Sequence, residues 1–337
     1  MKTEAVHAAA TIEDVAVAAG VSRSTVSRVV NGSTAVSPSA AAAVKAAIRE
    51  LGFVPNRAAR SLAGRQTYTI ALVVAEDTTR FFSDPYFASI VAGVSSRLEE
   101  SDYIFTLFIA SDDPGAKMTG YLLGGNVDGA IVVSHHTSDT FIDSIATAMP
   151  VVYGGRPLRE HAGDYYVDID NVQGARDATE YLIGKGHRRI ATITGPLDMP
   201  PGIDRLRGWR EALRAVGVAE GPVEDGDFTA EGGLAAMRRI LATGRVPDAI
   251  FVASDLMARG AMSALAVEGL RVPDDVAIIG FDDSPVATTV APRLTTMRQP
   301  TLSQGARMTD VLLSLLGGGD PPRVTMMGAE LVVRDSA

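Results

Sequence analysis

Residues 11–31 read TIEDVAVAAGVSRSTVSRVVN and decide how the amino-terminal part of the chain folds. Thr11 suits a helix N-cap, and apolar residues recur behind it at helical spacing until Gly20, which tolerates the positive φ of a helix end. Ser22 suits the N-cap of a second helix, in which Val26 faces inward while arginine and serine side chains face solvent. Two short helices joined by a tight glycine turn predict a helix-turn-helix.

The outward face of the second helix has the chemistry of a DNA-reading surface. Arginine presents two parallel donors to a guanine edge, and serine, threonine and asparagine reach base edges or phosphates. The alternative is a polar helix face that only contacts solvent. The candidate DNA contacts in this stretch are Thr11, Ser22, Arg23, Ser24, Thr25, Ser27, Arg28 and Asn31.

The residues that follow this stretch also favour DNA binding. A third helix is predicted from Ser37-Pro38 to about Leu51, and Gly52 ends it. The 11–31 stretch, followed by Val36-Ser37 and then Gly52-Phe53-Val54-Pro55-Asn56, closely resembles the DNA-binding head of the lactose-repressor/galactose-repressor (LacI/GalR) family. That resemblance implies a regulator of transcription.

Residues 57–63, which follow the head, are too few for a helix that is stable alone in water. We therefore expect this segment to become helical only when it packs against a partner. In the family it is a hinge that folds on DNA and pushes a leucine into the minor groove, which bends the duplex. The resemblance gives this role to Leu62, and the alternative is an interdomain linker with one incidental leucine. The candidate contacts of the hinge are Asn56, Arg57, Arg60, Leu62 and Ala63.

Composition and charge agree with a regulator of this kind. The chain has 337 residues, 46% of them apolar and 21% charged, which predicts two or three globular units. It has no cysteine, which excludes disulfides and thiolate catalysis. Residues 1–66 hold eight basic and four acidic side chains, which gives a net charge of +4. Because the whole chain has a net charge of −9, residues 67–337 carry −13. A basic head on an acidic body confines phosphate attraction to one end.

No apolar run is long enough to span a bilayer, and the first ten residues lack the pattern of a secretory signal. We therefore expect a cytoplasmic protein without a membrane partner.

From Tyr68 onward short apolar strands alternate with helices, which predicts parallel sheets covered on both faces. The expected fold is α/β: a three-helix head and hinge helix, then a two-lobed, doubly wound domain like the periplasmic binding proteins. The expected divisions are 1–55 for the head, 56–66 for the hinge and linker, and 67–337 for the effector-binding and dimerisation domain, with a first lobe of about 67–164 and 298–325 and a second of about 165–297 and 326–337.

The domain expected at residues 67–337 resembles the same family and the periplasmic sugar-binding proteins related to it. Matching segments include Asp170-Asn171, Arg205-Leu206-Arg207-Gly208-Trp209, Gly280-Phe281-Asp282-Asp283 and residues 292–300. The family topology implies three crossings between lobes, so that residues 301–316 return to the first lobe. It also implies that the ligand lies in the cleft between the lobes, outside the carboxyl ends of the strands.

The candidate effector contacts follow from this alignment and from the needs of a sugar, which takes paired donors and acceptors and a flat apolar face. Arg205 aligns with the arginine that grips ligand oxygens, and Asp282 with the carboxylate that accepts from hydroxyls; both could instead be surface ion-pair residues. Phe228 aligns with a stacking aromatic, or is core. Ser254 replaces a longer amide, which weakens the case for that contact. The full set is Phe81, Phe82, Tyr86, Arg205, Phe228, Ser254, Asp255, Asp282 and Gln299, of which Phe81 and Phe82 are placed on the loop after the first strand and cannot both point into one cavity.

No cofactor or metal is expected, because His135-His136 has no third ligand in view and Asp282-Asp283 has no matching acid. The sequence predicts a repressor that binds a pseudo-palindromic, double-stranded DNA operator as a homodimer and responds to a small molecule, expected to be a sugar or sugar derivative. One alternative is a periplasmic-type solute-binding protein, which would need an export signal. The other is an enzyme, for which no nucleotide-binding or nucleophile motif is present.

Overall fold

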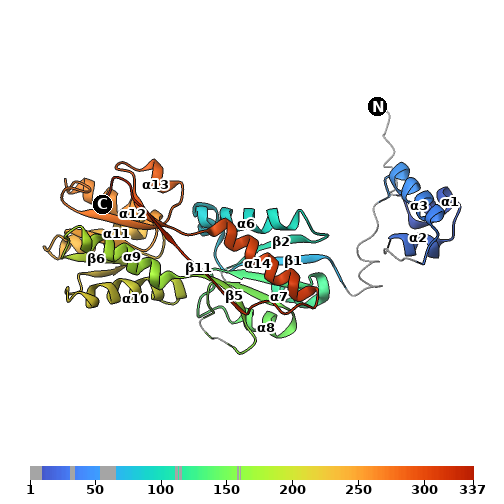
Figure 1. Cartoon of the computed structure of the whole chain (residues 1–337), viewed down its shortest axis with the longest axis horizontal. Coiled ribbons are helices and arrows are strands. Elements are labelled where there is room, and N and C mark those ends of the chain that lie inside the picture. The colour runs from blue at the N-terminus through green and yellow to red at the C-terminus, as the bar shows by residue number, and fades with distance from the viewer. Residues whose placement is uncertain are drawn as a thin grey trace. The chain divides into compact units, whose positions relative to one another are not determined.

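The computed structural model describes residues 10–30, 35–53, 66–110, 113, 116–157, 159 and 161–337, and the chain divides into two compact units (Figure 1). The first unit is Met1–Thr67 and the second is Tyr68–Ala337. The candidate DNA contacts Asn31, Asn56, Arg57, Arg60, Leu62 and Ala63 lie outside the described residues, so the hinge helix remains an expectation from the sequence.

The described residues of the first unit form three helices around a small core. They are α1 (Ile12–Ala19), α2 (Arg23–Val30) and α3 (Pro38–Leu51). Thr11 and Asp14 form a reciprocal capping box, and Gly20 ends α1 with φ 65°. Val26 of α2 is fully buried against α1 and α3. This core fixes α2, so that its opposite face is presented to solvent.

The second unit contains two six-stranded sheets, one in each lobe. The first sheet has the order β11-β5-β4-β3-β1-β2 and the second β12-β10-β9-β8-β6-β7, with every neighbouring pair parallel except β10 and β12. The strands of the first sheet are β1 (Thr69–Val74), β2 (Ile104–Ile109), β3 (Gly129–Val133), β4 (Val151–Gly154), β5 (Tyr165–Ile169) and β11 (Val324–Met327). Those of the second are β6 (Ile190–Thr194), β7 (Val223–Asp225), β8 (Ala249–Val252), β9 (Ala277–Asp282), β10 (Thr295–Arg298) and β12 (Glu330–Val332).

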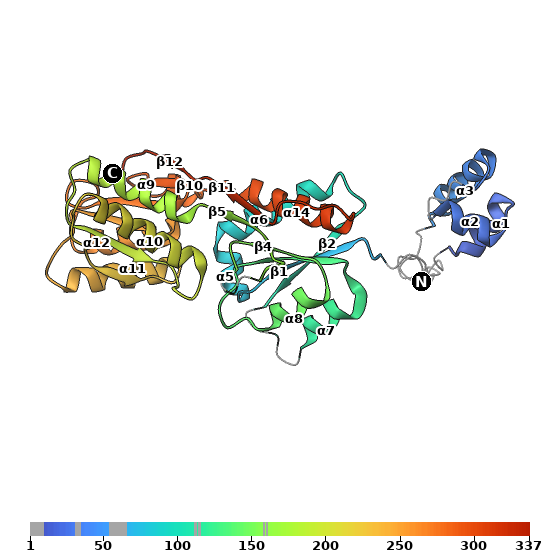
Figure 2. The same cartoon turned by 60° about the horizontal axis from the view of Figure 1, so that its bottom comes forward.

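Helices cover both faces of each sheet (Figures 1 and 2). The helical segments of the first lobe are α5 (Thr78–Ser83), α6 (Pro85–Leu98), α7 (Lys117–Tyr121), the π-helical turn η1 (Leu122–Asn126), α8 (Phe141–Ala148) and α14 (Thr301–Leu316). Those of the second are α9 (Asn171–Gly184), α10 (Pro200–Ala215), α11 (Ala230–Ala242), α12 (Asp255–Val267) and α13 (Val286–Thr289). Central strands β1 and β3 are buried along their whole length, as the sequence of parallel strands predicts.

The chain crosses between the lobes after β5, after β10 and after β11, and α14 returns to the first lobe as expected. The expected lobe boundaries were wrong by one strand. Residues 165–169 were assigned to the second lobe, but they form β5, which pairs with β4 and β11 in the first sheet. Strand β11 likewise straddles the expected boundary at 325. The lobe to which each of these strands belongs is decided by its pairing with strands that lie far away in the sequence.

Two glycines bring α6 and α14 into close contact over the first sheet. A Cβ atom at Gly93 would lie 2.1 Å from the carbonyl oxygen of Leu302, and one at Gly305 would lie 2.5 Å from that of Ile90. The missing side chains let the two backbones touch. Helix α14 thereby holds Gln304, which projects from its first turn toward the cleft between the lobes.

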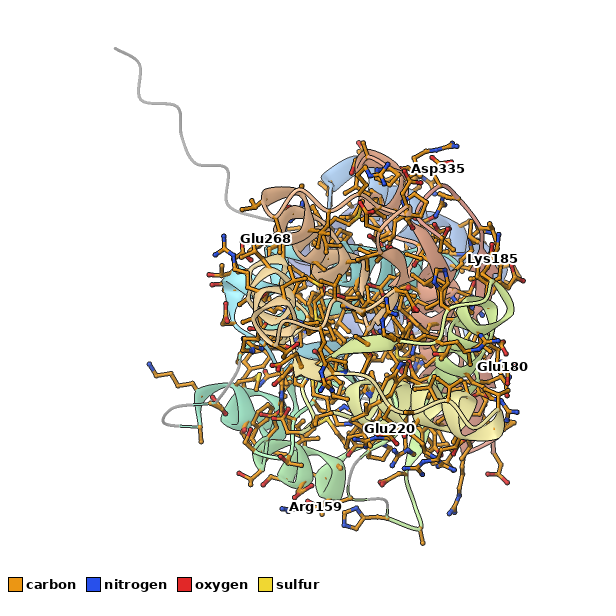
Figure 3. The ribbon with its side chains drawn as sticks, turned by 90° about the vertical axis from the view of Figure 1, so that its left-hand side faces the viewer. Arg159, Glu180, Lys185, Glu220, Glu268 and Asp335 are labelled. Atoms are coloured by element: carbon orange, nitrogen blue, oxygen red, sulfur yellow. The ribbon has the colours of Figure 1, made fainter. Side chains whose placement is uncertain are left out.

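Charged side chains cover the outside of the second unit. Figure 3 shows Glu180, Lys185, Glu220, Glu268 and Asp335 at its periphery, and all five are exposed. Many surface carboxylates pair with neighbouring arginines, as Glu220 does with Arg210 and Arg214. Such exposed pairs contribute little stability, so the acidic excess acts mainly through solubility and long-range repulsion of phosphates.

Candidate ligand pocket and nucleic-acid interface

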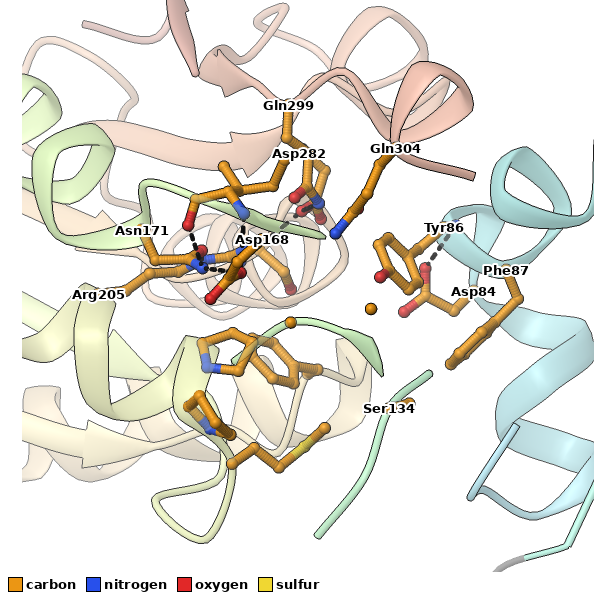
Figure 4. Close-up of a pocket in the computed structure, with 18 of the residues that line it drawn as sticks. Asp84, Tyr86, Phe87, Ser134, Asp168, Asn171, Arg205, Asp282, Gln299 and Gln304 are labelled. Carbon is orange, nitrogen blue, oxygen red and sulfur yellow. Dashed lines mark hydrogen bonds and ion pairs between the residues drawn. The ribbon is translucent and has the colours of Figure 1, made fainter. Parts of the chain in front are cut away.

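A pocket lies between the two lobes of the second unit, at the carboxyl ends of the strands (Figure 4). It encloses about 690 Å³ of empty space, including its open mouth. Six of the nine candidate effector contacts line it: Tyr86, Arg205, Phe228, Ser254, Asp282 and Gln299. The lining residues that the sequence analysis missed are Arg80, Asp84, Phe87, Ser134, His135, Gly154, Gly155, Asp168, Ile169, Asn171, Met199, Pro200, Pro201 and Gln304.

Arg205 is the centre of the buried polar network in this pocket. Its Nε donates to Asn171 Oδ1 at 2.8 Å, and one Nη donates to the Ala253 carbonyl at 2.6 Å. The guanidinium lies 3.7 Å from the centroid of the Phe281 ring and 3.7 Å from a carboxylate oxygen of Asp282. Only 5% of Arg205 is exposed, so its charge and orientation are fixed before any ligand arrives.

Asp282 ends β9 in an unusual backbone conformation. Its φ is 123°, and that of Asp283 is 55°. Two consecutive non-glycine residues with positive φ are uncommon, and such strain concentrates at functional sites. Burial raises the pKa of Asp282 well above its usual value, while Arg205 opposes that shift. Gln299 holds the carboxylate in place by donating its Nε2 to Oδ1 at 2.7 Å.

Asp168 and Asn171 complete the network. The sequence analysis did not predict either of them as an effector contact. Asp168 lies near the end of β5 and accepts from the backbone nitrogens of Arg156 and Ile169 at 2.9 and 2.7 Å. Asn171 opens α9 and donates to Asp168 and to the Ile169 carbonyl. The signal was present in the sequence, because a polar residue at the end of a buried strand, followed by a helix start, is where parallel sheets bind ligands.

Phe228 forms an apolar wall of the pocket. It is 8% exposed and has a φ of 62°. A Cβ atom at position 195 would lie 2.1 Å from its ring, so Gly195 makes room for it. From the first lobe, Arg80 lies over the same ring at 5.7 Å and donates to the Asp227 carbonyl at 2.5 Å. Phe228 is therefore packed and faces the pocket as well.

Two expected contacts, Phe81 and Phe82, do not line the pocket. The segment expected to be a loop is helix α5, which Asp77 caps. Phe82 is 79% exposed, and Phe81 packs on Phe87 with ring centroids 5.5 Å apart. Neither residue belongs to the set of lining residues. A helix turns successive side chains by about 100°, which rotates these two away from the cleft and leaves Arg80 facing it.

Asp255 is a structural residue rather than a lining one. It is fully buried, and its carboxylate accepts from Thr296 Oγ1 at 2.5 Å and from the Ser284 backbone nitrogen at 2.8 Å. Burial raises its pKa to about 7. Its neighbour Ser254 does line the pocket, where its hydroxyl accepts from the Met257 nitrogen as the N-cap of α12.

In addition to the bonds of Asn171 to Asp168 and Ile169, polar contacts between described residues join the two lobes around the pocket. His136 of the first lobe contacts Asp198 of the second at 2.9 Å, and Arg156 donates to Asp204 at 3.1 Å. The bond from Arg80 to the Asp227 carbonyl is another. Because each contact connects one lobe to the other, opening of the cleft must break it.

The candidate DNA contacts that the structure describes lie on α2 or directly before it, except Thr11, which caps α1. Thr11, Ser22, Arg23, Ser24 and Arg28 are exposed, while Thr25 and Ser27 are half-buried. Arg23 forms an exposed ion pair with Glu13 at 3.0 Å, which a phosphate or base can replace at little cost. Ser22 accepts from the Thr25 nitrogen and so fixes the start of the helix.

Within the described residues, no group of three or more histidine, cysteine, aspartate or glutamate side chains is placed to hold a metal ion. Among the same residues, no helix has both the length and the apolar character needed to cross a bilayer.

Comparisons with known proteins agree with both units. The family model described as bacterial regulatory proteins, lacI family, matches residues 11–56, and that of a periplasmic binding protein-like domain matches residues 179–337. The chain is 48% identical to the HTH-type transcriptional regulator CelR of Thermobifida fusca, covering 97% of this chain and 98% of the relative. It is 38% identical to the ribose operon repressor of Escherichia coli K12, over 90% and 92% of the two chains.

Solved structures give the same result. A CelR–cellobiose complex matches with a TM-score of 0.78 and 45% identity, covering 97% of this chain and all of the other. The lac repressor dimer bound to operator and an anti-inducer matches with a TM-score of 0.85 and 30% identity, covering 98% and 99%.

A helix-turn-helix unit followed by a two-lobed, ligand-binding unit defines a DNA-binding regulator that responds to a small molecule. The chain belongs to the lacI family of bacterial transcriptional regulators. The alternative of a periplasmic-type solute-binding protein is set aside, because the family match includes the DNA-binding head.

Proposed function

We propose that this chain is a repressor that binds a pseudo-palindromic DNA operator as a homodimer and is controlled by a sugar or sugar derivative in the pocket between its lobes. The observation that carries the proposal is the buried network of Arg205, Asn171 and Asp282, which lines a cleft in a chain that also has a helix-turn-helix unit. Rigid, paired polar groups beside an aromatic wall suit adjacent hydroxyls and the apolar face of a sugar ring.

Cellobiose is the effector that we propose to test first. The relative that is 48% identical has a solved structure titled as a complex with cellobiose. In this chain the proposed contacts are the six candidates that line the pocket, Tyr86, Arg205, Phe228, Ser254, Asp282 and Gln299, together with Asp168 and Asn171.

For operator binding we propose that α2 reads the major groove through Arg23, Ser24 and Arg28, with Thr11, Ser22, Thr25, Ser27 and Asn31 as further contacts. The hinge role of Leu62 and Ala63 is proposed from the sequence alone, as are the supporting contacts of Asn56, Arg57 and Arg60. Effector binding would rotate the lobes and release the hinge. This is a regulatory rather than catalytic role, and we place it in the cytoplasm, where the operator is.

Gel retardation with a palindromic probe whose centre is C-G tests the proposal, at two salt concentrations and with cellobiose, ribose or no sugar. We expect sequence-selective retention that weakens at the higher salt concentration. A Leu62→Gly variant is expected to lose retention while it keeps sugar binding. Equal loss of both activities would contradict the hinge role, and retention unaffected by any sugar tested would contradict control by a sugar.

A further inference from the structure

Two buried side chains on the first-lobe wall of the pocket have polar atoms without a partner. Gln304 of α14 is 2% exposed and His135, just after β3, is 8% exposed. Within the described residues, neither Gln304 Oε1 nor His135 Nδ1 has a hydrogen-bond partner, and both residues line the pocket. Figure 4 shows Gln304 reaching into the pocket between Asp168 and Tyr86. A buried polar atom without a partner is costly, so a ligand that satisfies it gains affinity.

The partners of the other atoms settle what each side chain offers to a ligand. Gln304 donates one N–H of its amide to the Val167 carbonyl at 3.0 Å, and within the described residues its Oε1 is an acceptor without a donor. His135 Nε2 faces the Arg156 carbonyl at 3.3 Å. A carbonyl only accepts, so Nε2 must carry the proton, and burial lowers the pKa of His135 to about 4. His135 is therefore neutral at pH 7, and its Nδ1 presents a lone pair.

Several other groups on this wall are acidic, although Tyr86 also contributes a hydroxyl that can donate. Asp84 and Asp168 are carboxyls whose pKa values burial raises, and Ser134 donates its hydroxyl proton to Glu76 at 2.6 Å. Arg80 is a cation on the same lobe, but it lies over Phe228 and donates to the Asp227 carbonyl across the cleft. On the opposite wall, Arg205 supplies donors.

We propose that His135 and Gln304 are specificity residues, which require hydroxyl donors on the first-lobe side of the ligand and reject phosphorylated or carboxylated sugars there. This deepens the proposed function and rests on it. A phosphate on that side would face acceptors that cannot pair with it, beside the carboxyls of Asp84 and Asp168. A neutral sugar would instead give each lone pair a hydroxyl proton.

The experiment measures binding by the full chain to three matched pairs of probes: cellobiose and cellobiose 6′-phosphate, glucose and glucose 6-phosphate, ribose and ribose 5-phosphate. Whichever neutral member binds is expected to bind about tenfold or more tightly than its phosphate, because a buried polar group that is left without a hydrogen-bond partner weakens binding. A phosphorylated sugar that binds as well as its neutral partner overturns the inference but leaves sugar control intact. Failure of all six to bind overturns both.

Variants separate a specificity role from a structural one. Calorimetry with monodeoxyfluoro analogues of the neutral sugar that binds is expected to find at least one hydroxyl whose replacement weakens binding to the unmodified chain about tenfold. Gln304→Leu or His135→Phe should abolish that penalty, since the acceptor is gone, whereas Gln304→Glu keeps an acceptor and should retain it. Gln173→Leu, on the exposed surface of α9, is the matched control. A penalty that is unchanged in both acceptor-lacking variants would overturn the assignment.

Discussion

At the scale of single residues, the pocket depends on polar groups that the fold has taken out of water and paired. Arg205 contacts Asn171, the Ala253 carbonyl and Asp282 while it lies on the ring of Phe281. A buried cation is stable only when all its partners are present, and those partners come from three different elements or their ends, α9, β8 and β9. The ligand therefore meets a charge whose desolvation and orientation have already been offset by folding.

Arg205→Met should abolish effector binding. The variant loses the donors and leaves Asp282 and Asn171 buried without their partner, so we also expect a loss of about 3 kcal/mol in the free energy of unfolding. Calorimetric titration with cellobiose and gel retardation with the operator are the two measurements. We expect no detectable sugar binding and operator binding that no longer responds to cellobiose.

Arg205→Lys serves as the companion variant, because it keeps the charge and loses the planar fork. If Arg205→Lys bound cellobiose with wild-type affinity, the positive charge alone would suffice. That result would contradict a role for the paired N–H donors of the guanidinium group.

His136 predicts a pH dependence of stability. Glu76 and then Asp198 raise its pKa to about 9, against burial. A histidine with a folded-state pKa above the unfolded value of about 6.5 contributes its full stabilisation below pH 6.5 and loses it as the pH rises to 9. This contribution is at most about 3 kcal/mol. Burial lowers the pKa of His135 to about 4, below this window, and raises that of Asp255 to about 7, so that Asp255 overlaps only the lower end of the window.

Thermal unfolding of the wild type and of His136→Gln between pH 6.5 and 9 tests this prediction. The difference in Tm between the two proteins should shrink as the pH rises. A difference that stays constant over the window would show that the imidazolium does not bridge Glu76 and Asp198.

At the scale of elements, the first lobe depends on how closely α6 and α14 approach each other. Gly93 and Gly305 permit that approach, and α14 in turn positions Gln304 in the pocket. Helix α14 begins more than 200 residues after the end of α6, so the contact depends on the second crossing between the lobes rather than on local sequence. Small residues at this seam therefore affect the pocket without touching any ligand.

Gly93→Ala should destabilise the protein by about 2 kcal/mol, since the added methyl meets the Leu302 carbonyl and helices that overpack lose about 1–3 kcal/mol. Gly120→Ala is the matched control, because no described atom lies within 4 Å of an added Cβ there and alanine favours a helix. Urea unfolding of both variants measures the effect. Equal stability of the two variants would contradict the close seam.

At the scale of the whole molecule, a small basic unit that suits DNA and an acidic unit that suits a small molecule share one chain. Polar contacts between described residues join the lobes of the second unit around the pocket, so we expect cleft opening and ligand occupancy to be energetically linked. Linkage is reciprocal for equilibrium binding. The factor by which a sugar changes operator affinity equals the factor by which operator changes sugar affinity.

The linkage can be measured in both directions. Cellobiose at about a hundred times its dissociation constant should add about 2.7 kcal/mol to the stability of the protein. Fluorescence anisotropy of a labelled operator with and without cellobiose, and calorimetry of cellobiose with and without operator, should give the same factor. Unequal factors would mean that a further equilibrium, such as dimer dissociation, intervenes.

Local sequence predicted the parts of this protein whose physics is local. Thr11 and Gly20 bound the first helix through capping and positive φ, and buried runs such as 69–74 identified central strands. The likeness to a family then predicted the α/β fold, the DNA-binding head and six pocket residues. Strands β7, β11 and β12, of three or four residues each, were not predicted, because so short a run has no readable period.

Tertiary structure decided what depends on partners distant in the sequence. The turn of α5 moved Phe82 to solvent and Arg80 to the cleft, and the end of β5 put Asp168 beside Asn171 and Arg205. Gln304 and His135 became acceptors only because Val167 and Arg156 occupy their other atoms. The sequence determines which side chains are present and which segments form helices or strands. Only packing determines which atoms remain for a ligand, because a hydrogen bond made inside the protein is not available outside it.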